Sequence, residues 1–199
     1  MSGAVKTIAC LADAAEAPTE IRLLNKAEPL VVGRGSKGNK SDLGNAMTQL
    51  SIDAMGKTPL CKQLSGVVDR LRDLEDELRT ADKIALLLIM TDCESSDGDI
   101  VDVLKMLEGF PLQIIIRICS HEREINEYWQ NVNAQLDLDI YVLGQVKTEA
   151  LIVAENNNWL TYGEPLHSLR EFGVMVPAIN NLDSRQLTKQ EIRTIAQIL

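Results

Sequence analysis

The sequence lacks several features that would define whole classes of protein. None of its apolar runs reaches the about 18 residues that a membrane-spanning helix needs, and no charged segment followed by a cleavable apolar stretch opens it. Its four cysteines include no Cys-x-x-Cys pair. Its net charge is -9, so it offers no basic field to a nucleic acid or an anionic membrane. These absences predict a cytoplasmic protein without a zinc site, a disulfide framework, a nucleic-acid partner or a membrane partner.

What is present is the composition of an ordinary globular core. The chain has 199 residues, of which 45% are hydrophobic, and it shows no internal repeat or low-complexity segment. We expect one α/β domain over residues 1–155. Residues 156–199 hold no long strand, and we expect them to form a helical C-terminal extension that packs on the same domain. Thr188 and Glu191 match a capping box that opens its last helix.

The most apolar stretch runs from Ile84 to Met90 and is followed at once by polar residues. Seven consecutive apolar residues are typical of a strand buried on both faces, in the middle of a parallel sheet. Open α/β sheets bind ligands at the carboxyl ends of their strands, and this strand ends in the polar segment Thr91–Ser96. Asp97 and Asp99 precede the helical pattern that starts at Ile100, so we expect one of them to be an N-cap.

The rest of the chain alternates between patterns of strand and helix. The expected elements are a helix over 4–16, paired strands over 20–24 and 28–32, helices over 41–52 and 64–78, a strand over 84–90, a helix from 100, a strand over 112–118, a helix over 125–136, a strand over 138–143 and a helix over 145–155. Alternation from 58 to 155 predicts a doubly wound, mostly parallel, Rossmann-like sheet with helices on both faces.

A glycine motif raises the alternative of a nucleotide-binding enzyme. Gly33, Gly35 and Gly38 match the dinucleotide fingerprint Gly-x-Gly-x-x-Gly and follow an expected strand. The fingerprint also requires an unbroken helix and then a second strand that ends in an acidic residue. Here Gly44 interrupts the helix and a loop occupies the place of that strand. A turn is the favoured interpretation, and nucleotide binding is kept as the alternative.

Neither histidine of the chain has the surroundings of a catalytic base. Cys119 and His121 end an expected strand, but no acidic residue that would orient the histidine is evident, so Cys119 is interpreted as structural. His167 lies beside Leu166 and Leu169 on an apolar helical face, which is typical of a core or surface histidine. Neither histidine is therefore assigned a catalytic role.

Three segments together resemble the von Willebrand factor type A domain. They are the loop 56–60 (Gly-Lys-Thr-Pro-Leu) that opens a helix, the apolar strand that runs into Thr91 and Asp92 with the segment 95–98 (Ser-Ser-Asp-Gly) behind it, and the next strand, 112–119. The resemblance covers most of the chain. It implies a protein that binds and is not an enzyme, with a metal-ion-dependent adhesion site that takes an acidic residue of a protein partner.

The resemblance also implies which residues would hold the metal. Thr58 matches the family's threonine ligand and Asp92 its second aspartate, each reaching Mg²⁺ directly or through water. Glu94, Ser95 and Ser96 are their neighbours in a second shell. A hard cation held by few protein oxygens keeps coordination positions open, and the carboxylate of a partner can complete its octahedron.

The chain departs from the family at its first motif. Asp-x-Ser-x-Ser is absent, and the nearest string, residues 13–17 (Asp-Ala-Ala-Glu-Ala), lacks both hydroxyls. If the helix over 4–16 matches the one that follows this motif, the central strand is missing. Three explanations stay open: a shortened or inactive relative, a strand supplied by a partner in a homo- or hetero-oligomer, or a sheet that closes differently. We predict an interaction module with a partial site, the alternatives being the nucleotide-binding enzyme and a structural subunit completed by a partner strand.

Overall fold

The computed structural model describes all residues except 1, 15–16, 27, 33–55, 175 and 199, and it divides into two compact units. The first unit comprises Met1–Leu74 and Glu94–Met106, and the second comprises Glu75–Cys93 and Leu107–Leu199. The described part is an α/β structure with a parallel, Rossmann-like sheet, which confirms the predicted fold class at that level.

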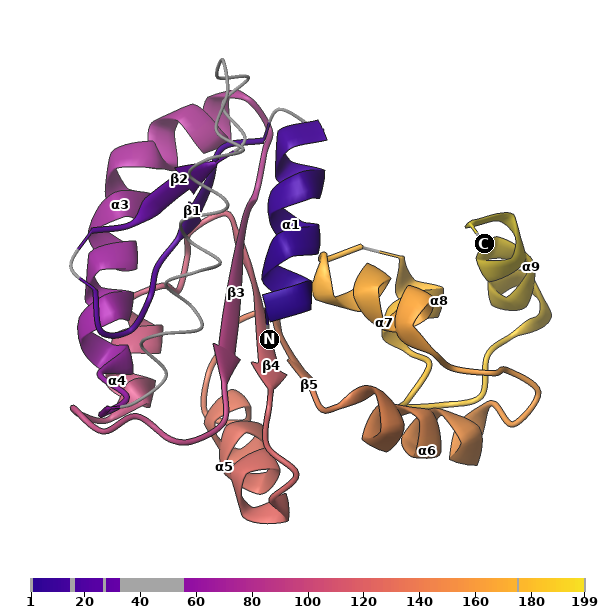
Figure 1. Ribbon diagram of the computed structural model, residues 1–199. Coiled ribbons are helices and arrows are strands. Elements are labelled where there is room, and N and C mark those ends of the chain that lie inside the picture. The colour runs from indigo at the N-terminus through magenta and orange to yellow at the C-terminus, as the bar shows by residue number, and fades with distance from the viewer. Residues whose placement is uncertain (1, 15–16, 27, 33–55, 175, 199) are drawn as a thin grey trace. The chain divides into compact units, whose positions relative to one another are not determined.

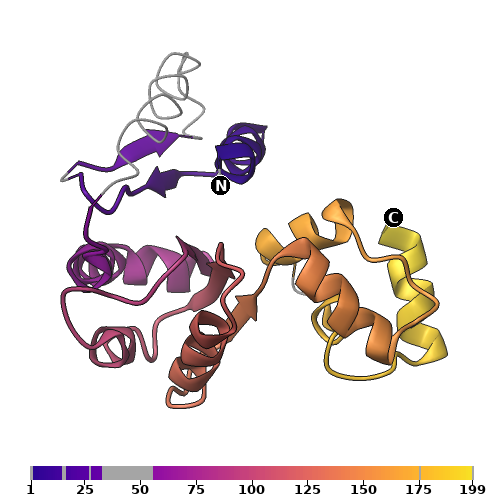
Figure 2. The same ribbon diagram turned by 60° about the horizontal axis from the view of Figure 1, so that its bottom comes forward.

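The first unit begins with helix α1 (Ser2–Ala14) and a hairpin of two short strands, β1 (Thr19–Ile21) and β2 (Leu30–Val32). The strands are antiparallel, as predicted. Alanines on one face of α1 let the helix approach β2 closely, and Ala9, Ala12 and Val32 form a small buried core there. Figure 2 shows α1 beside the hairpin. The predicted helix over 41–52 lies outside the described residues.

Helix α3 (Leu60–Thr80) follows the predicted amphipathic pattern. Its buried face includes Leu64, Val68 and Leu71, whereas its charged residues remain on the outside. The side-chain amide of Gln63 donates hydrogen bonds to the carbonyls of Leu24 (3.0 Å) and Lys26 (2.9 Å), which fastens the turn of the hairpin to this helix. Helix α4 (Ile100–Lys105) completes the first unit, with its two N-terminal residues and Leu104 buried.

The second unit contains the sheet. Strands β3 (Ala85–Thr91), β4 (Leu112–Ile118) and β5 (Ile140–Leu143) are parallel and lie side by side in that order (Figure 1). All three lie where the sequence predicts strands. β4 is the middle strand of the three, and five of its seven residues are buried. A doubly wound sheet reverses its strand order at one point, whereas the order β3-β4-β5 follows the chain without a reversal. The doubly wound arrangement therefore stays a prediction.

β3 is not the strand covered on both faces that its sequence predicts. Within the described part of the chain it pairs with β4 alone. Ile84 is 52% exposed and Leu86 is 45% exposed, and only Ile89 and Thr91 of β3 are buried. The prediction was wrong because the composition of a strand indicates only which surroundings the strand tolerates, not which surroundings it has. Its position in the sheet depends on pairing with distant segments.

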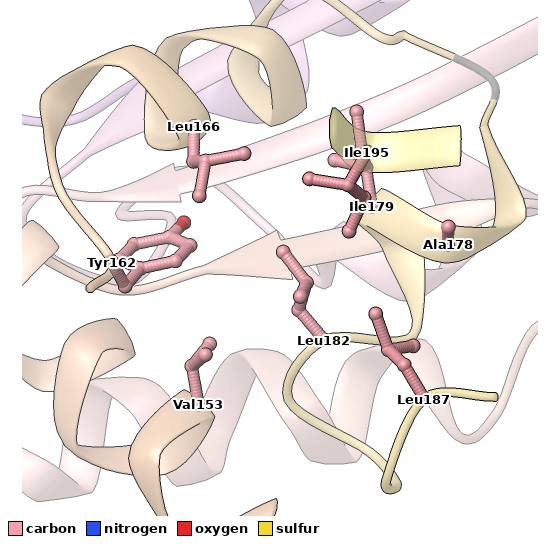
Figure 3. Close-up of a cluster of buried hydrophobic side chains, with 8 residues drawn as sticks. All are labelled: Val153, Tyr162, Leu166, Ala178, Ile179, Leu182, Leu187 and Ile195. Atoms are coloured by element: carbon pink, nitrogen blue, oxygen red, sulfur yellow. The ribbon is translucent and has the colours of Figure 1, made fainter. Parts of the chain in front are cut away.

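The helices of the second unit are α5 (Arg123–Asn133), α6 (Val146–Asn156), α7 (Glu164–Glu171), α8 (Pro177–Asn180) and α9 (Lys189–Ile198). In Figure 2 the helices from α6 to α9 gather around one another at the C-terminal end of the chain. Figure 3 shows the core that they share, which consists of Val153, Tyr162, Leu166, Ala178, Ile179, Leu182, Leu187 and Ile195. None of the described helices combines the length and apolar character required to cross a membrane.

The predicted capping box of α9 is confirmed. The backbone N–H of Thr188 donates to Glu191 Oε2 (2.9 Å), and the backbone N–H of Glu191 donates to Thr188 Oγ1 (3.3 Å). Hydrogen bonds from Arg185 and Thr188 hold the pKa of the Glu191 carboxyl at about 2. This reciprocal pair explains why α9 begins where it does.

Candidate functional site

The polar segment that follows β3 folds back onto the N-terminus of α3 within the first unit. Asp97 Oδ1 accepts a hydrogen bond from the backbone N–H of Cys61 (3.0 Å), and Oδ2 accepts one from that of Lys62 (2.9 Å). The backbone N–H of Ser96 donates to the carbonyl of Thr58 (2.9 Å). Two loops that are far apart in the sequence, 56–60 and 94–99, are therefore joined; we call them the joined loops.

Asp97 acts as an N-cap that is supplied from a distant part of the chain. The first backbone N–H groups of a helix have no partner inside the helix, and a carboxylate satisfies them while also favouring the positive end of the helix dipole. The hydroxyl of Ser95 donates a further hydrogen bond to Asp97 Oδ1 (2.8 Å). Although burial alone would raise it, these hydrogen bonds from Lys62, Ser95 and Cys61 hold the pKa of Asp97 below its ordinary value.

Asp99 has the same role for α4, where its Oδ1 accepts a hydrogen bond from the backbone N–H of Val101 (2.9 Å). The sequence predicts one N-cap among Asp97 and Asp99, and the structure shows that both are caps, on different helices. The carboxylates of Asp97 and Asp99 are therefore both engaged with backbone amides, at the N-termini of α3 and α4.

Replacing Asp97 by alanine is expected to lower the free energy of unfolding by about 1 kcal/mol, the usual cost of losing an N-cap. Asp73→Ala is the matched control, because Asp73 is exposed on the same helix, and it should change stability by no more than about 0.5 kcal/mol. Urea denaturation of both variants measures the difference. Equal effects would show that the hydrogen bonds of Asp97 add nothing to the stability of α3.

The predicted site residues fall in different parts of the structure. Thr58, Glu94, Ser95 and Ser96 belong to the first unit, and its hydrogen bonds bring Thr58 and Ser96 together. Asp92 belongs to the second unit, where it follows β3 directly and is exposed. The glycines of the alternative nucleotide loop, Gly33, Gly35 and Gly38, lie outside the described residues.

The chemistry of the donors limits what kind of cation this segment could hold. Among the described residues, no group of three or more histidine, cysteine and acidic side chains is placed to hold a metal. Both oxygens of Asp97 already accept hydrogen bonds from α3. The hydroxyl of Thr58 and the carboxylate of Asp92 are hard oxygen donors, the type that Mg²⁺ prefers, and Mg²⁺ commonly uses only one or two protein carboxylates. By their chemistry these two donors are of a kind that suits Mg²⁺, and they belong to different units of the structure.

A second group of polar residues, which the sequence did not reveal, lies inside the second unit. Its members are ionisable side chains brought together from β4, α6, α7, the segment before α7 and the segment between α8 and α9. They are Arg117, Glu149, Tyr162, His167, Arg170, Glu171 and Asp183. We call this group the buried ionic cluster.

Arg170 lies at one end of the buried ionic cluster, with only 4% of its side chain exposed. Its Nη1 donates to Glu149 Oε2 (2.8 Å) and to the hydroxyl of Tyr162 (3.4 Å), and its Nη2 donates to Asp183. Burial alone would lower it, but the neighbouring Asp183, Tyr162 and Glu149 raise the pKa of the Arg170 guanidinium. Glu149 Oε1 also accepts the backbone N–H of Gly144, directly after β5 (2.8 Å). Arg170 thereby connects α7 to α6 and to the segment before α9.

The other end of the cluster connects α7 to the sheet. Arg117 of β4 pairs with Glu171 of α7, with 2.7 Å between Nη1 and Oε1. His167 is fully buried, its Nδ1 lies 2.9 Å from the Tyr162 hydroxyl, and its Nε2 lies 3.6 Å from Glu171 Oε1. Burial raises the pKa of Tyr162 to about 12, so its hydroxyl stays protonated.

A signal for this cluster is present in the sequence. Positions 167, 170 and 171 share one face of α7 with Leu166, which is buried. Charged residues at positions where a helix turns inward are expected to be paired, since an unpaired buried charge is costly. Their charged partners outside α7 lie 13 or more residues away in the chain, and the helical pattern does not specify them.

In comparisons with known proteins, no family model, curated protein or solved structure matches the chain. The class that the structure itself defines is an α/β protein with a parallel, Rossmann-like sheet and a C-terminal layer of helices.

Proposed function

We propose that this chain is a non-enzymatic protein-interaction module, resembling a von Willebrand factor type A domain, that binds its partner through the joined loops. The observation that carries the proposal is the double hydrogen bond of Asp97 to Cys61 and Lys62, which holds the segment after β3 against the loop of Thr58. Loops held on a rigid scaffold are the usual location of binding residues. Lys57, Glu94 and Ser96 are exposed there and are available for contact.

The charge of this region favours a cation as an intermediary. The segment 92–99 carries four acidic residues within a chain whose net charge is -9. An acidic group of a partner would be repelled by such a surface, whereas a bound Mg²⁺ attracts both. The resemblance implies Thr58 and Asp92 as its protein ligands, and water with one carboxylate of the partner would supply the remaining oxygens. The cation would supply electrostatic attraction and geometric specificity.

Calorimetric titration with Mg²⁺ tests the metal part of this proposal. Wild-type protein should release or absorb heat on binding, and Asp92→Ala should abolish the signal because it removes the only charged ligand. Asp102→Ala is the matched control, since Asp102 is an exposed aspartate of α4 outside the joined loops, and it should bind Mg²⁺ like the wild type.

Null heats for both wild type and Asp92→Ala would remove the cation from the proposal. The interaction surface is tested separately by Ser96→Arg, which places a bulky cation on the joined loops. This variant should lose the proteins that the wild type captures, and unchanged capture would overturn the assignment of the surface.

A further inference from the structure

His167 is the central link of the buried ionic cluster, and its protonation state follows from its neighbours. The guanidinium of Arg170 can only donate hydrogen bonds, so it is the donor to the Tyr162 hydroxyl oxygen. The Tyr162 hydroxyl directs its own hydrogen toward Nδ1 of His167, because the opposite assignment would turn a bare Nε2 lone pair toward the Glu171 carboxylate. Nδ1 is the acceptor, and the single ring proton is on Nε2, which faces Glu171. The structure therefore assigns the neutral Nε2–H tautomer to His167.

A second proton on this ring has no favourable place in the folded arrangement. Burial, the Arg117 guanidinium and the Arg170 guanidinium lower the pKa of His167 to about 3. Glu171 is the nearest carboxylate, but its Oε1 lies closer to Arg117 (2.7 Å) than to the imidazole (3.6 Å). A proton on Nδ1 would also displace the hydrogen of the Tyr162 hydroxyl from its acceptor. The charged imidazole is thus far more stable in water than in this cluster.

Because His167 is enclosed by several elements, its protonation is coupled to a change in how these elements pack. Among the described residues, the charged and titratable groups around it come from several elements. They are Arg117 of β4, Tyr162 before α7, Arg170 and Glu171 of α7 itself, and, through Arg170, Glu149 of α6 and Asp183 of the segment before α9. Hydrating the ring requires the elements around it to separate, because the ring is fully enclosed, and the Arg117–Glu171 pair is the contact by which α7 is tied to β4 beside it.

We propose that α7 is an acid-sensitive latch: proton uptake by His167 favours a state in which α7 has separated from β4 and the helices α7 to α9 have loosened. This inference does not depend on the proposed interaction function. It assigns to the C-terminal helical layer a conformational response to acid.

The direction and size of the response follow from linkage between protonation and opening. In the open state His167 takes up a proton at its ordinary pKa of 6.5, whereas in the closed state it does so only near 3. The closed state is therefore fully favoured above pH 6.5 and loses about tenfold in the closed-to-open ratio for each pH unit below it. At about pH 5 the loss is roughly thirtyfold. Histidine is the side chain whose ordinary pKa lies in this window, and the chain has only two.

Amide hydrogen exchange measured by mass spectrometry at about pH 7 and about pH 5 tests the proposal. After correction for intrinsic exchange, protection of α7 in the wild type should fall roughly thirtyfold at the lower pH, while β4 keeps its protection. His167→Gln should abolish the pH dependence. His121→Gln is the matched control, because His121 is exposed, and it should behave like the wild type.

Three outcomes would overturn the latch: no loss of protection at α7 in the wild type, the same loss in His167→Gln, or an equal loss in β4. If His167→Gln does not fold, ring nitrogen NMR of the wild type decides. The latch requires His167 to remain the neutral Nε2–H tautomer in molecules whose α7 is protected at about pH 5. A doubly protonated ring in molecules whose α7 is still protected would refute it.

Discussion

Replacing Arg170 by methionine is expected to lower the free energy of unfolding by about 3–5 kcal/mol, because removing one partner of a buried ion pair leaves the other charge buried and unpaired. Arg170 is buried and binds both Glu149 and Asp183. Methionine keeps much of the apolar stem, so the loss reports mainly on the charge. Urea denaturation followed by circular dichroism measures it.

Arg123→Met is the matched control for this prediction. Arg123 also pairs with a carboxylate, Glu127, at 2.6 Å, but its side chain is 88% exposed. An exposed pair four residues apart on a helix contributes only about 0.3–0.5 kcal/mol. If Arg170→Met and Arg123→Met had the same small effect, the buried ionic cluster would not contribute to the stability of the second unit.

Truncating Trp129 to alanine is expected to lower the free energy of unfolding by about 3–5 kcal/mol, the range measured for large aromatic residues in protein cores. Trp129 lies on α5 and is fully buried, and its ring meets the ring of Tyr128 edge to face, with 5.4 Å between centroids. The cavity left by the indole would remove contacts between α5 and its surroundings. Thermal or urea unfolding checks the prediction.

The chain contains its own control for this experiment, since its second tryptophan, Trp159, is 46% exposed. Trp159→Ala should lower the free energy of unfolding by no more than about 1 kcal/mol. Trp129→Phe should lose less than Trp129→Ala, because phenylalanine fills much of the space and removes an indole N–H that meets no acceptor in the described part of the structure. A cost of Trp129→Ala no larger than that of Trp159→Ala would contradict the burial of this ring.

Local patterns predicted most of the elements correctly. The apolar stripe of α3, the apolar run of β4 and the capping box of α9 each depend on residues close together in the sequence. Helix periodicity, strand composition and capping chemistry act over a few residues, so they can be recognised without knowing the fold. The parallel pairing of β3, β4 and β5 also followed, because the intervening helices leave room for crossovers.

The candidate site could be predicted only in outline. The sequence indicated that the segment after β3 is polar and that Asp97 or Asp99 caps a helix. It did not indicate that Asp97 caps α3, whose first residue lies 37 positions earlier in the chain (97 - 60). The Mg²⁺ ligands Thr58 and Asp92 rest on a resemblance and stay a prediction.

By itself the sequence determined the type and approximate position of most helices and strands, and the parallel direction of β3, β4 and β5, since these properties arise from backbone geometry and neighbouring side chains. Only the tertiary structure decided that β3 has one partner in the described sheet, that Asp97 serves α3, and that His167 and Arg170 meet carboxylates of other elements. The physical reason is that pairing energies between distant groups depend on distance and burial. Neither quantity exists until the chain has folded.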